Sequence, residues 1–384
     1  MNALDTHNIT PRSEYGYIPG LDGLRAVAVW IVLFAHLGWS HIIPGGFGVT
    51  VFFFISGFLI TRLLLAEREK KGRIKLGDFY IRRFLRLIPA LFVMLIISGA
   101  AMLALGKAIP LWEAVSAFTY TMNYQFAYLG FTGAGPGTPW DHLWSLAVEE
   151  HFYLLFPLLL IFAKADYAKA LKIGLGICAA ALAWRFIAIF GLKFPWQYTY
   201  AATETRLDNI LYGCLLSLGL HVAPSHRFWG WIKGIAPVAL AGAALMSTFL
   251  IREEWYRETL RYTIQGMSLF VLVFNLMFFR PMSIFVKFLE LKPMRWMGQI
   301  SYGLYLWHVP FTFLAADHLG IAKASLPFVA FVLIGTFAMT CASYYWIEQP
   351  VVKLRKRFGS HTREDGKKIE AEKSAGSAIP APAE

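Results

Sequence analysis

Two ionisable side chains stand in the first apolar run of the sequence. Arg25 and His36 are separated by ten residues within LDGLRAVAVWIVLFAHLG, residues 21–38. Eleven helical steps of about 100° make roughly three turns, so both side chains lie on one helix face, about 16 Å apart along the axis. Histidine titrates near neutral pH and can take a proton from a hydroxyl, as acyl transfer to an alcohol requires. His36 is therefore a candidate general base, with simple packing between helices as the alternative.

A pair of carboxylates lies in a later apolar run. WDHLWSLAVEEHFYLLFPLLL, residues 140–160, contains Glu149 and Glu150, and carboxylates inside a membrane span are costly without partners. Adjacent helical residues point about 100° apart, so a single groove would favour one of the two. We expect Glu149 about 12 Å below the outer end of the run, a depth that could bring it near His36 to orient the imidazole. A structural ion pair with an arginine such as Arg185 is the alternative.

Three arginines stand where the third apolar run leaves its basic flank. FYIRRFLRLIP, residues 79–89, contains Arg82, Arg83 and Arg86, whose spacings of three and four allow all of them to share one helical side. Guanidinium groups match phosphate oxygens, so a phosphorylated donor such as coenzyme A would be a natural ligand. Basic residues at a cytoplasmic boundary are also ordinary topology anchors, and the spacing alone leaves both interpretations open.

The elements that would position these side chains are membrane helices. The chain has 384 residues, of which 57% are hydrophobic and only 16% charged, whereas about a quarter are charged in a soluble domain. Its apolar runs approach the roughly 20 residues that span a bilayer. We predict an all-α polytopic membrane protein with about ten transmembrane helices, at residues 24–40, 47–66, 84–105, 143–163, 171–190, 207–222, 232–251, 262–280, 299–318 and 325–346.

Basic residues orient these helices. The connection at residues 62–86 alone holds nine Lys and Arg. If the N-terminus is cytoplasmic, the cytoplasmic segments together hold about four times as many Lys and Arg residues as the outer segments. The formal charge of +12 therefore reflects membrane topology and does not indicate a nucleic-acid partner. We expect both termini to be cytoplasmic, in a multi-pass protein of the cell inner (plasma) membrane.

Three segments are expected along the chain. Residues 1–16 form a polar cytoplasmic N-terminal segment, residues 17–350 a single transmembrane domain, and residues 351–384 a basic cytoplasmic tail. The tail is rich in charged residues and poor in aromatics, so we expect it to be disordered.

Six ordered motifs resemble the acyltransferase 3 family of integral membrane acyltransferases, which includes O-antigen and exopolysaccharide O-acetyltransferases. The resemblance covers about residues 17–350 and rests on GLDGLRAVAVWIVLFAH, GGFGVTVFFFISGFLIT, FYIRRFLRLIP, WSLAVEEHFYLLFP, ISYGLYLWHVP and YWIEQP. It implies ten transmembrane helices and transfer of an acyl group, most often acetyl, from cytoplasmic acyl-CoA to a hydroxyl, often of a sugar at the outer face.

The family's patterns fall on numbered residues of this chain. Its arginine-X10-histidine, RxxR and WSLxxE patterns fall, in that order, on Arg25 and His36, on Arg83 and Arg86, and on Trp144, Ser145 and Glu149. The resemblance implies that His36 is a general base or a transient acyl carrier, assisted by Glu149 and Arg25. It also implies donor binding at Arg82, Arg83 and Arg86. On the same motifs we expect substrate contacts from Asp22, Trp144, Ser145, Tyr305 and His308, although packing is the simpler role for His308.

The residues alone leave two other classes open. A polytopic transporter or flippase would also carry intramembrane His, Arg and Glu, but it often has inverted repeats, and no internal repeat is evident. A non-catalytic receptor or assembly factor would leave His36 dispensable. A transferase requires a tunnel of thioester size that ends at His36.

The expected ligands follow from the transferase interpretation. They are acyl-CoA, as a co-substrate rather than a tightly bound cofactor, a carbohydrate acceptor and membrane lipids. No metal site is expected, because the histidines lack paired ligand spacing. Some larger relatives carry an extracytoplasmic hydrolase-like domain, for which this sequence offers no candidate. We therefore expect the membrane unit to perform the whole reaction or to use a separate partner of cell-envelope biosynthesis.

Overall fold

The computed structural model of the protein describes residues 17–135, 137–164 and 166–356, and within these residues every regular element is a helix. In this part of the chain, ten helices have at least 14 residues: α1 (Leu21–Phe34), α2 (Gly45–Lys71), α3 (Leu76–Ala104), α6 (Trp144–Phe162), α7 (Tyr167–Phe186), α9 (Thr203–Val222), α11 (Ile235–Leu250), α13 (Leu260–Phe278), α15 (Lys292–Phe313) and α16 (Leu326–Ser343). Each of the ten ranges expected from the sequence falls on one of them.

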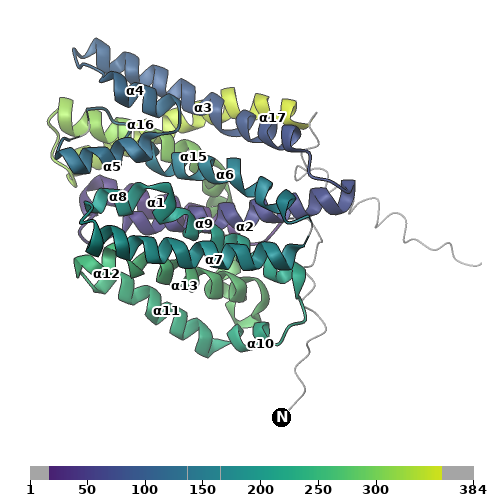
Figure 1. The fold of residues 1–384 in the computed structure, drawn as a ribbon. Coiled ribbons are helices and arrows are strands. Elements are labelled where there is room, and N and C mark those ends of the chain that lie inside the picture. Colours follow the sequence, from purple (N-terminus) through teal and green to yellow (C-terminus); the bar gives the residue numbers. More distant parts are fainter. Residues whose placement is uncertain (1–16, 136, 165, 357–384) are drawn as a thin grey trace, which may run out of the picture.

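Shorter helices connect the long ones. They are α4 (Leu111–Phe118), α5 (Met122–Thr132), α8 (Trp196–Ala201), α10 (Phe228–Ile232), α12 (Glu254–Glu258), α14 (Ser283–Leu289) and α17 (Gln349–Lys356). The long helices lie side by side, with α8 and α12 at one end of the bundle and α10 at the other (Figure 1). Following the predicted orientation, we call these the outer and the inner end.

Seven helical segments in the described part of the chain are long and apolar enough to cross a bilayer: Leu21–Trp39, Gly45–Lys71, Leu76–Ala104, Asp141–Phe162, Tyr167–Gly191, Leu260–Phe278 and Leu326–Val352. The predicted class, an all-helical membrane protein, is therefore confirmed. Helices α9, α11 and α15 are not among the seven, and α11 has only 16 residues. The expected N-terminal segment at 1–16 and residues 357–384 of the expected tail lie outside the described residues, while residues 349–356 form α17.

Helices α2 and α9 touch backbone to backbone. A methyl group added at Gly57 would stand 2.0 Å from the carbonyl oxygen of Ile210, and one added at Gly213 would stand 2.0 Å from that of Phe54. Small residues allow membrane helices to approach this closely. The contact fixes the middle of α2, and with it Ser56, which precedes Gly57 in the chain.

A buried ion pair joins α7 to α9. The Arg185 guanidinium donates to Asp208 over 2.9 Å, and it also donates to the Thr263 hydroxyl of α13 and to the Thr205 carbonyl oxygen. Neither side chain of the pair is exposed. Each neutralises the charge of the other, which would be costly to bury alone. Arg185 is thereby committed to Asp208 and is not the ion-pair partner that the sequence suggested for Glu149.

The outer end of α1 leaves the α-helical path in a π-helical turn, Ala35–Trp39. Gly38 has φ +115° in this turn, and a methyl group there would stand 2.9 Å from the Ala324 backbone nitrogen. The same nitrogen donates to the Leu37 carbonyl oxygen over 2.9 Å. The turn is thus tied to the connection between α15 and α16, which fixes the position of His36.

Candidate active site

A cavity of about 70 Å³ lies between α1, α2, α3, α6 and α15. On this measure a single water needs about 10–15 Å³, so the cavity is several times larger than the space that one water requires. The apolar lining comes mainly from α2. The polar lining residues are Arg25, Ser56, Arg83, Arg86, Ser145, Glu149, Tyr153, Ser301, Tyr302 and Tyr305.

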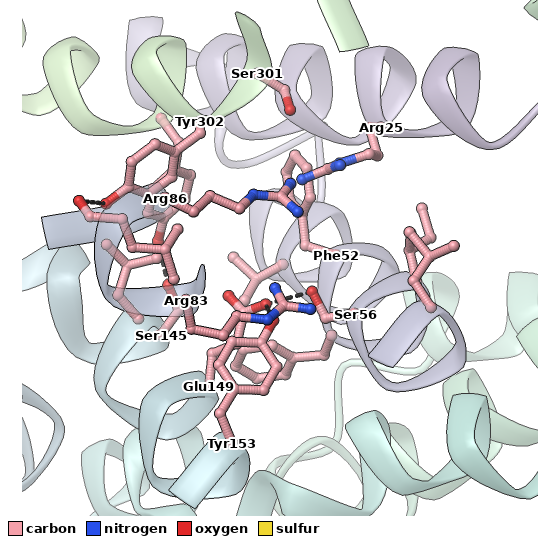
Figure 2. A pocket seen from close by; sticks show the side chains of 17 residues that line it. Arg25, Phe52, Ser56, Arg83, Arg86, Ser145, Glu149, Tyr153, Ser301 and Tyr302 are labelled. Atoms are coloured by element: carbon pink, nitrogen blue, oxygen red, sulfur yellow. Dashed lines mark hydrogen bonds between the residues drawn. The ribbon is translucent and has the colours of Figure 1, made fainter. Parts of the chain in front are cut away.

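Three arginines from two helices face this cavity. Arg25 comes from α1, and Arg83 and Arg86 come from α3; the guanidinium groups of Arg25 and Arg86 lie close together in Figure 2. Arg25 has no carboxylate oxygen within 4.0 Å in the described part of the chain, and its Nε is buried without a hydrogen-bond partner. The structure therefore brings together Arg25 and the two arginines of the RxxR pattern, in a setting suited to an anion.

Glu149 lies with the arginines and not with His36. Its Oε1 accepts hydrogen bonds from the hydroxyls of Ser56 and Tyr153, and the Arg83 guanidinium lies 4.5 Å from the centre of the Tyr153 ring (Figure 2). From the start of α6 at Trp144, five residues carry Glu149 about 7.5 Å inward, to the level of the middle of α2. The expected approach of Glu149 to His36 is therefore corrected. Asp141 is a carboxylate close enough to His36 to interact with it electrostatically.

Arg82 is separated from its two neighbours. Its Nη2 donates to Glu67 Oε2 over 2.7 Å, and both side chains are buried. It does not line the cavity, in contrast to Arg83 and Arg86. The expectation that all three arginines share one helical side and one ligand is corrected, because an acidic residue of α2 holds Arg82.

Two further expected substrate contacts lie outside the cavity wall. Asp22 is in the first turn of α1, where its carbonyl oxygen stands 1.8 Å from a methyl group added at Gly298, so α15 packs directly against it. Trp144 is buried, with its ring 4.8 Å from that of Tyr200 and 5.2 Å from the Arg206 guanidinium. Packing between helices therefore explains both positions better than contact with a substrate in this cavity.

Ser145 and Tyr305, two of the expected substrate contacts, are the lining residues of α6 and α15 nearest the outer end of the bundle. The Tyr305 hydroxyl donates to the His142 carbonyl oxygen over 2.8 Å, which leaves the Ser145 hydroxyl to donate to the Tyr305 oxygen over 2.6 Å. His36 is not among the lining residues. The cavity therefore does not reach His36, in contrast to the tunnel that a transferase led us to expect.

A cluster of three histidines stands between this part of the cavity and the outer end of the bundle. The ring centres of His36 and His308 are 4.8 Å apart, and those of His308 and His142 are 5.3 Å apart. His36 is exposed, whereas His308 and His142 are 1% and 5% exposed. The described residues contain no group of three or more His, Cys, Asp or Glu arranged to hold a metal.

Sequence reasoning gave no role to two residues of this region. His142 lies two positions before the WSLxxE pattern, but its ring contacts come from α15, more than 160 positions away, and no spacing rule could find them. Arg206 directly precedes the span expected at residues 207–222. It is fully buried, with 4.1 Å between its guanidinium and the Tyr262 ring centre, and it donates to Thr50, Asn209 and the Tyr200 carbonyl oxygen.

Comparison with known proteins adds a functional class to this geometry. A family model described as an acyltransferase domain matches residues 18–347. The chain is 33% identical to the peptidoglycan O-acetyltransferase OatA of Listeria monocytogenes serovar 1/2a over 359 residues, which are 90% of this chain and 57% of that relative. It is 32% identical to the O-acetyltransferase OatA of Staphylococcus aureus strain NCTC 8325, over 88% of this chain and 57% of the relative.

A putative O-acetyltransferase of Staphylococcus aureus strain COL is also 32% identical, over 91% of this chain and 59% of the relative. The chain thus spans somewhat more than half the length of these three relatives. No solved structure matches it.

Proposed function

The chain belongs to the acyltransferase 3 family of membrane acyltransferases, and on that premise we propose that it acylates a carbohydrate of the cell envelope. It transfers an acyl group, with acetyl as the first candidate, from cytoplasmic acyl-CoA to a hydroxyl of a cell-surface or lipid-linked carbohydrate. Peptidoglycan is the first acceptor to test, because the name of the Listeria relative specifies it.

One observation carries the proposal: a cavity whose lining combines three arginines with the hydroxyl groups of Ser145 and Tyr305. Coenzyme A has phosphates at one end and a thiol at the end of a long, thin arm. Arg25, Arg83 and Arg86 would hold the phosphates, because guanidinium forks match phosphate oxygens. The arm would then extend toward Ser145 and Tyr305, and Glu149 would keep the arginines in position.

His36 acts where the acyl group meets the acceptor. It is exposed, and its Nδ1 donates to the Val32 carbonyl oxygen over 2.9 Å, so its Nε2 remains to accept a proton or to carry an acyl group. As the acceptor oxygen bonds to the thioester carbon, the carbon–sulfur bond breaks and the hydroxyl proton passes to His36. The thioester must first pass His142 and His308, which requires these side chains to move.

In the arrangement that serves this reaction, the protein crosses the inner (plasma) membrane ten times. Both of its termini lie in the cytoplasm. Helices α9, α11 and α15 complete the ten, and they run alongside the other long helices in Figure 1. The excess of basic residues at the inner end favours this orientation. It puts the arginines on the donor side and His36 on the acceptor side.

The test is mass spectrometry of cell-surface glycans from cells that have the gene, lack it, or carry His36→Ala or His318→Ala at equal membrane levels. His318 is also exposed at the outer end and serves as the matched control. We expect an acyl mass increment with the wild type and with His318→Ala only. An increment that survives His36→Ala excludes the catalytic role of His36. Absence of any increment favours the transporter instead.

A further inference from the structure

We infer that the cavity selects its donor by the amide N–H groups of the coenzyme A arm, and that Glu149 Oε2 accepts from the N–H nearer the phosphates. The inference rests on the proposed function, in which three arginines hold the phosphates and the arm extends toward Ser145 and Tyr305. It gives Glu149 a direct contact with the donor, in addition to its place among the arginines.

The first support is the direction of the hydrogen bonds in the cavity wall. Six of the lining residues carry a hydroxyl group, and each of these hydroxyls donates its hydrogen inside the protein. The donor and acceptor pairs are Ser56–Glu149, Tyr153–Glu149, Ser145–Tyr305, Tyr305–His142, Ser301–Gly298 and Tyr302–Leu87, the last three with backbone carbonyl oxygens at 2.8 Å. A hydroxyl has one hydrogen, so these six oxygens can offer a ligand only lone pairs.

The second support is the carboxylate of Glu149, which keeps one oxygen for a ligand. Its Oε1 accepts from the hydroxyls of Ser56 on α2 and of Tyr153, one turn further along α6 (Figure 2). Its Oε2 accepts no hydrogen bond from the described residues, and none of their cationic groups lies within 4.0 Å of it. The unpaired Oε1 of Glu150 is fully enclosed, whereas Oε2 of Glu149 is not. Oε2 therefore presents an acceptor to the cavity.

The side-chain donors that remain are guanidinium groups. Among the described lining residues, Arg25, Arg83 and Arg86 alone have side-chain N–H groups. The backbone N–H groups of helix interiors are used in the helices themselves. The cavity thus provides donors at its arginines and acceptors along the rest of its wall. A ligand that fills it must bring hydrogens of its own beyond the part that the arginines bind.

The arm of coenzyme A brings such hydrogens. It contains two amide groups, and each amide N–H can only donate. An N–H that leaves water is costly to bury unless it meets an acceptor, and the same holds for an unpaired carboxylate oxygen. The two amide carbonyl oxygens of the arm can accept from guanidinium N–H groups that the phosphates leave unused, since each guanidinium has five. A plain alkyl arm would leave Oε2 of Glu149 without a partner.

Spacing along α6 assigns the two N–H groups. Ser145 and Glu149 are four residues apart, so they lie on one helix face about 6 Å apart, with Ser145 nearer the outer end. Four bonds separate the two amide nitrogens of the arm, about 5 Å when the arm is extended. The N–H nearer the phosphates therefore meets Glu149, and the N–H nearer the sulfur meets the Ser145 oxygen. The sulfur then lies beyond Ser145, toward His36, as the proposed reaction requires.

The test is the binding of coenzyme A and two analogues to the full-length protein in detergent, measured by isothermal titration calorimetry. In the first analogue an ester oxygen replaces the N–H nearer the phosphates. In the second an ester oxygen replaces the N–H nearer the sulfur. Each analogue keeps the phosphates and the length of the arm, but has a lone pair where coenzyme A has a hydrogen. The quantity compared is the Kd of an analogue divided by the Kd of coenzyme A for the same protein.

For the wild type we expect a first ratio of at least about ten, because hydrogen bonds to charged groups are worth that much or more. The second ratio should also exceed one, but by less, because Ser145 is neutral. In Glu149→Gln the side-chain oxygen can still accept from Ser56 and Tyr153, which turns the NH₂ group toward the arm. The first ratio should then fall to about one or below, while the second stays unchanged.

Glu150→Gln is the matched control. Glu150 is the adjacent carboxylate on α6 and does not line the cavity, so this variant should keep both wild-type ratios. If Glu149 only holds the arginines in place, Glu149→Gln weakens coenzyme A and its analogues equally, and the first ratio stays at its wild-type value. That result overturns the inference.

A first ratio near one in the wild type also overturns it, and this measurement needs no variant to fold. In both cases the proposed function stands, because coenzyme A still binds. A wild type that binds neither coenzyme A nor the analogues, and forms no acyl ester on the glycans of the cells that carry it, refutes the proposed function and the inference with it. The binding of coenzyme A itself thus separates the two failures.

Discussion

Arg82 and Glu67 form a buried ion pair, with 2.7 Å between Nη2 and Oε2. The next residue along α3, Arg83, faces the cavity instead, where it lies over the Tyr153 ring. Two adjacent arginines therefore have different tasks. One binds α3 to α2, and the other contributes positive charge to the candidate donor site.

Substitution should separate these tasks. Arg82→Gln leaves Glu67 with Lys71 alone at 3.3 Å, and breaking a buried ion pair costs about 3 kcal/mol or more. We expect a lower melting temperature in detergent with an unchanged KM for acetyl-CoA. Arg83→Gln should give the reverse, a raised KM with a nearly unchanged melting temperature. Equal increases in KM for both variants would contradict the assignment.

The contact between α2 and α9 leads to a second prediction. Gly57→Ala introduces a methyl group 2.0 Å from the Ile210 carbonyl oxygen, and overpacking of this kind costs about 1–3 kcal/mol. It should also displace Ser56 from Glu149, so acyl transfer should fall together with the melting temperature. Gly176→Ala in α7 is the matched control, because no atom lies within 4 Å of its added methyl group. It should be neutral or stabilising by up to about 1 kcal/mol.

The helices could be predicted from the sequence because apolar runs of about 20 residues are a strong signal. The start of α9 shows the limit of that signal. Glu204 and Arg206 lower the hydropathy before position 207, and Asp208 and Asn209 lower it just after. The expected span began at 207, whereas the helix begins at Thr203. Those polar groups are accommodated by tertiary contacts, such as that of Asp208 with Arg185, which no local pattern contains.

The sequence motifs indicate individual residues of the candidate site but not how these residues are arranged. The shared helix face of Arg25 and His36 follows from helical geometry, and the structure gives both of them polar surroundings. Glu149 was predicted to lie near His36, which is wrong. Distance along one helix gives the depth of a residue in the bundle, but it does not tell which side chain of the neighbouring helix lies at that depth. Ser56, from α2, occupies that place.

Arg206 is the subject of a third prediction. In the described residues, this buried guanidinium has no ion-pair partner within 4.0 Å. Its planar group lies 4.1 Å from the Tyr262 ring centre and donates three hydrogen bonds, a combination that lysine cannot reproduce. Arg206→Lys should destabilise the protein by about 2 kcal/mol or more, since buried cation–π contacts are worth about that much.

Arg227→Lys serves as the control for this effect. Arg227 lies 5.1 Å from the ring of Trp231, which is 65% exposed. An exposed pair is worth about 0.5–1 kcal/mol, so this variant should melt close to the wild type. Equal losses in melting temperature for the two variants would show that the buried contacts of Arg206 do not stabilise the protein more than the exposed contact of Arg227 does.

Binding of coenzyme A gives a fourth prediction, which does not depend on turnover. A ligand that binds only the folded state at 100 times its Kd stabilises that state by about 2.7 kcal/mol. Coenzyme A should therefore raise the melting temperature of the wild type and of His36→Ala. Arg25→Gln and Arg86→Gln should lose most of the increase, because both guanidinium groups face the cavity.

Pantetheine, which has the same arm without the phosphates, tests the physical basis of this stabilisation. If guanidinium–phosphate contacts provide the affinity, pantetheine should give little increase at the same concentration, and added salt should weaken the effect of coenzyme A. If pantetheine stabilises the protein as well as coenzyme A does, the arm and not the phosphates provides the affinity. Arg25 and Arg86 would then act on the reacting end of the donor or on Glu149.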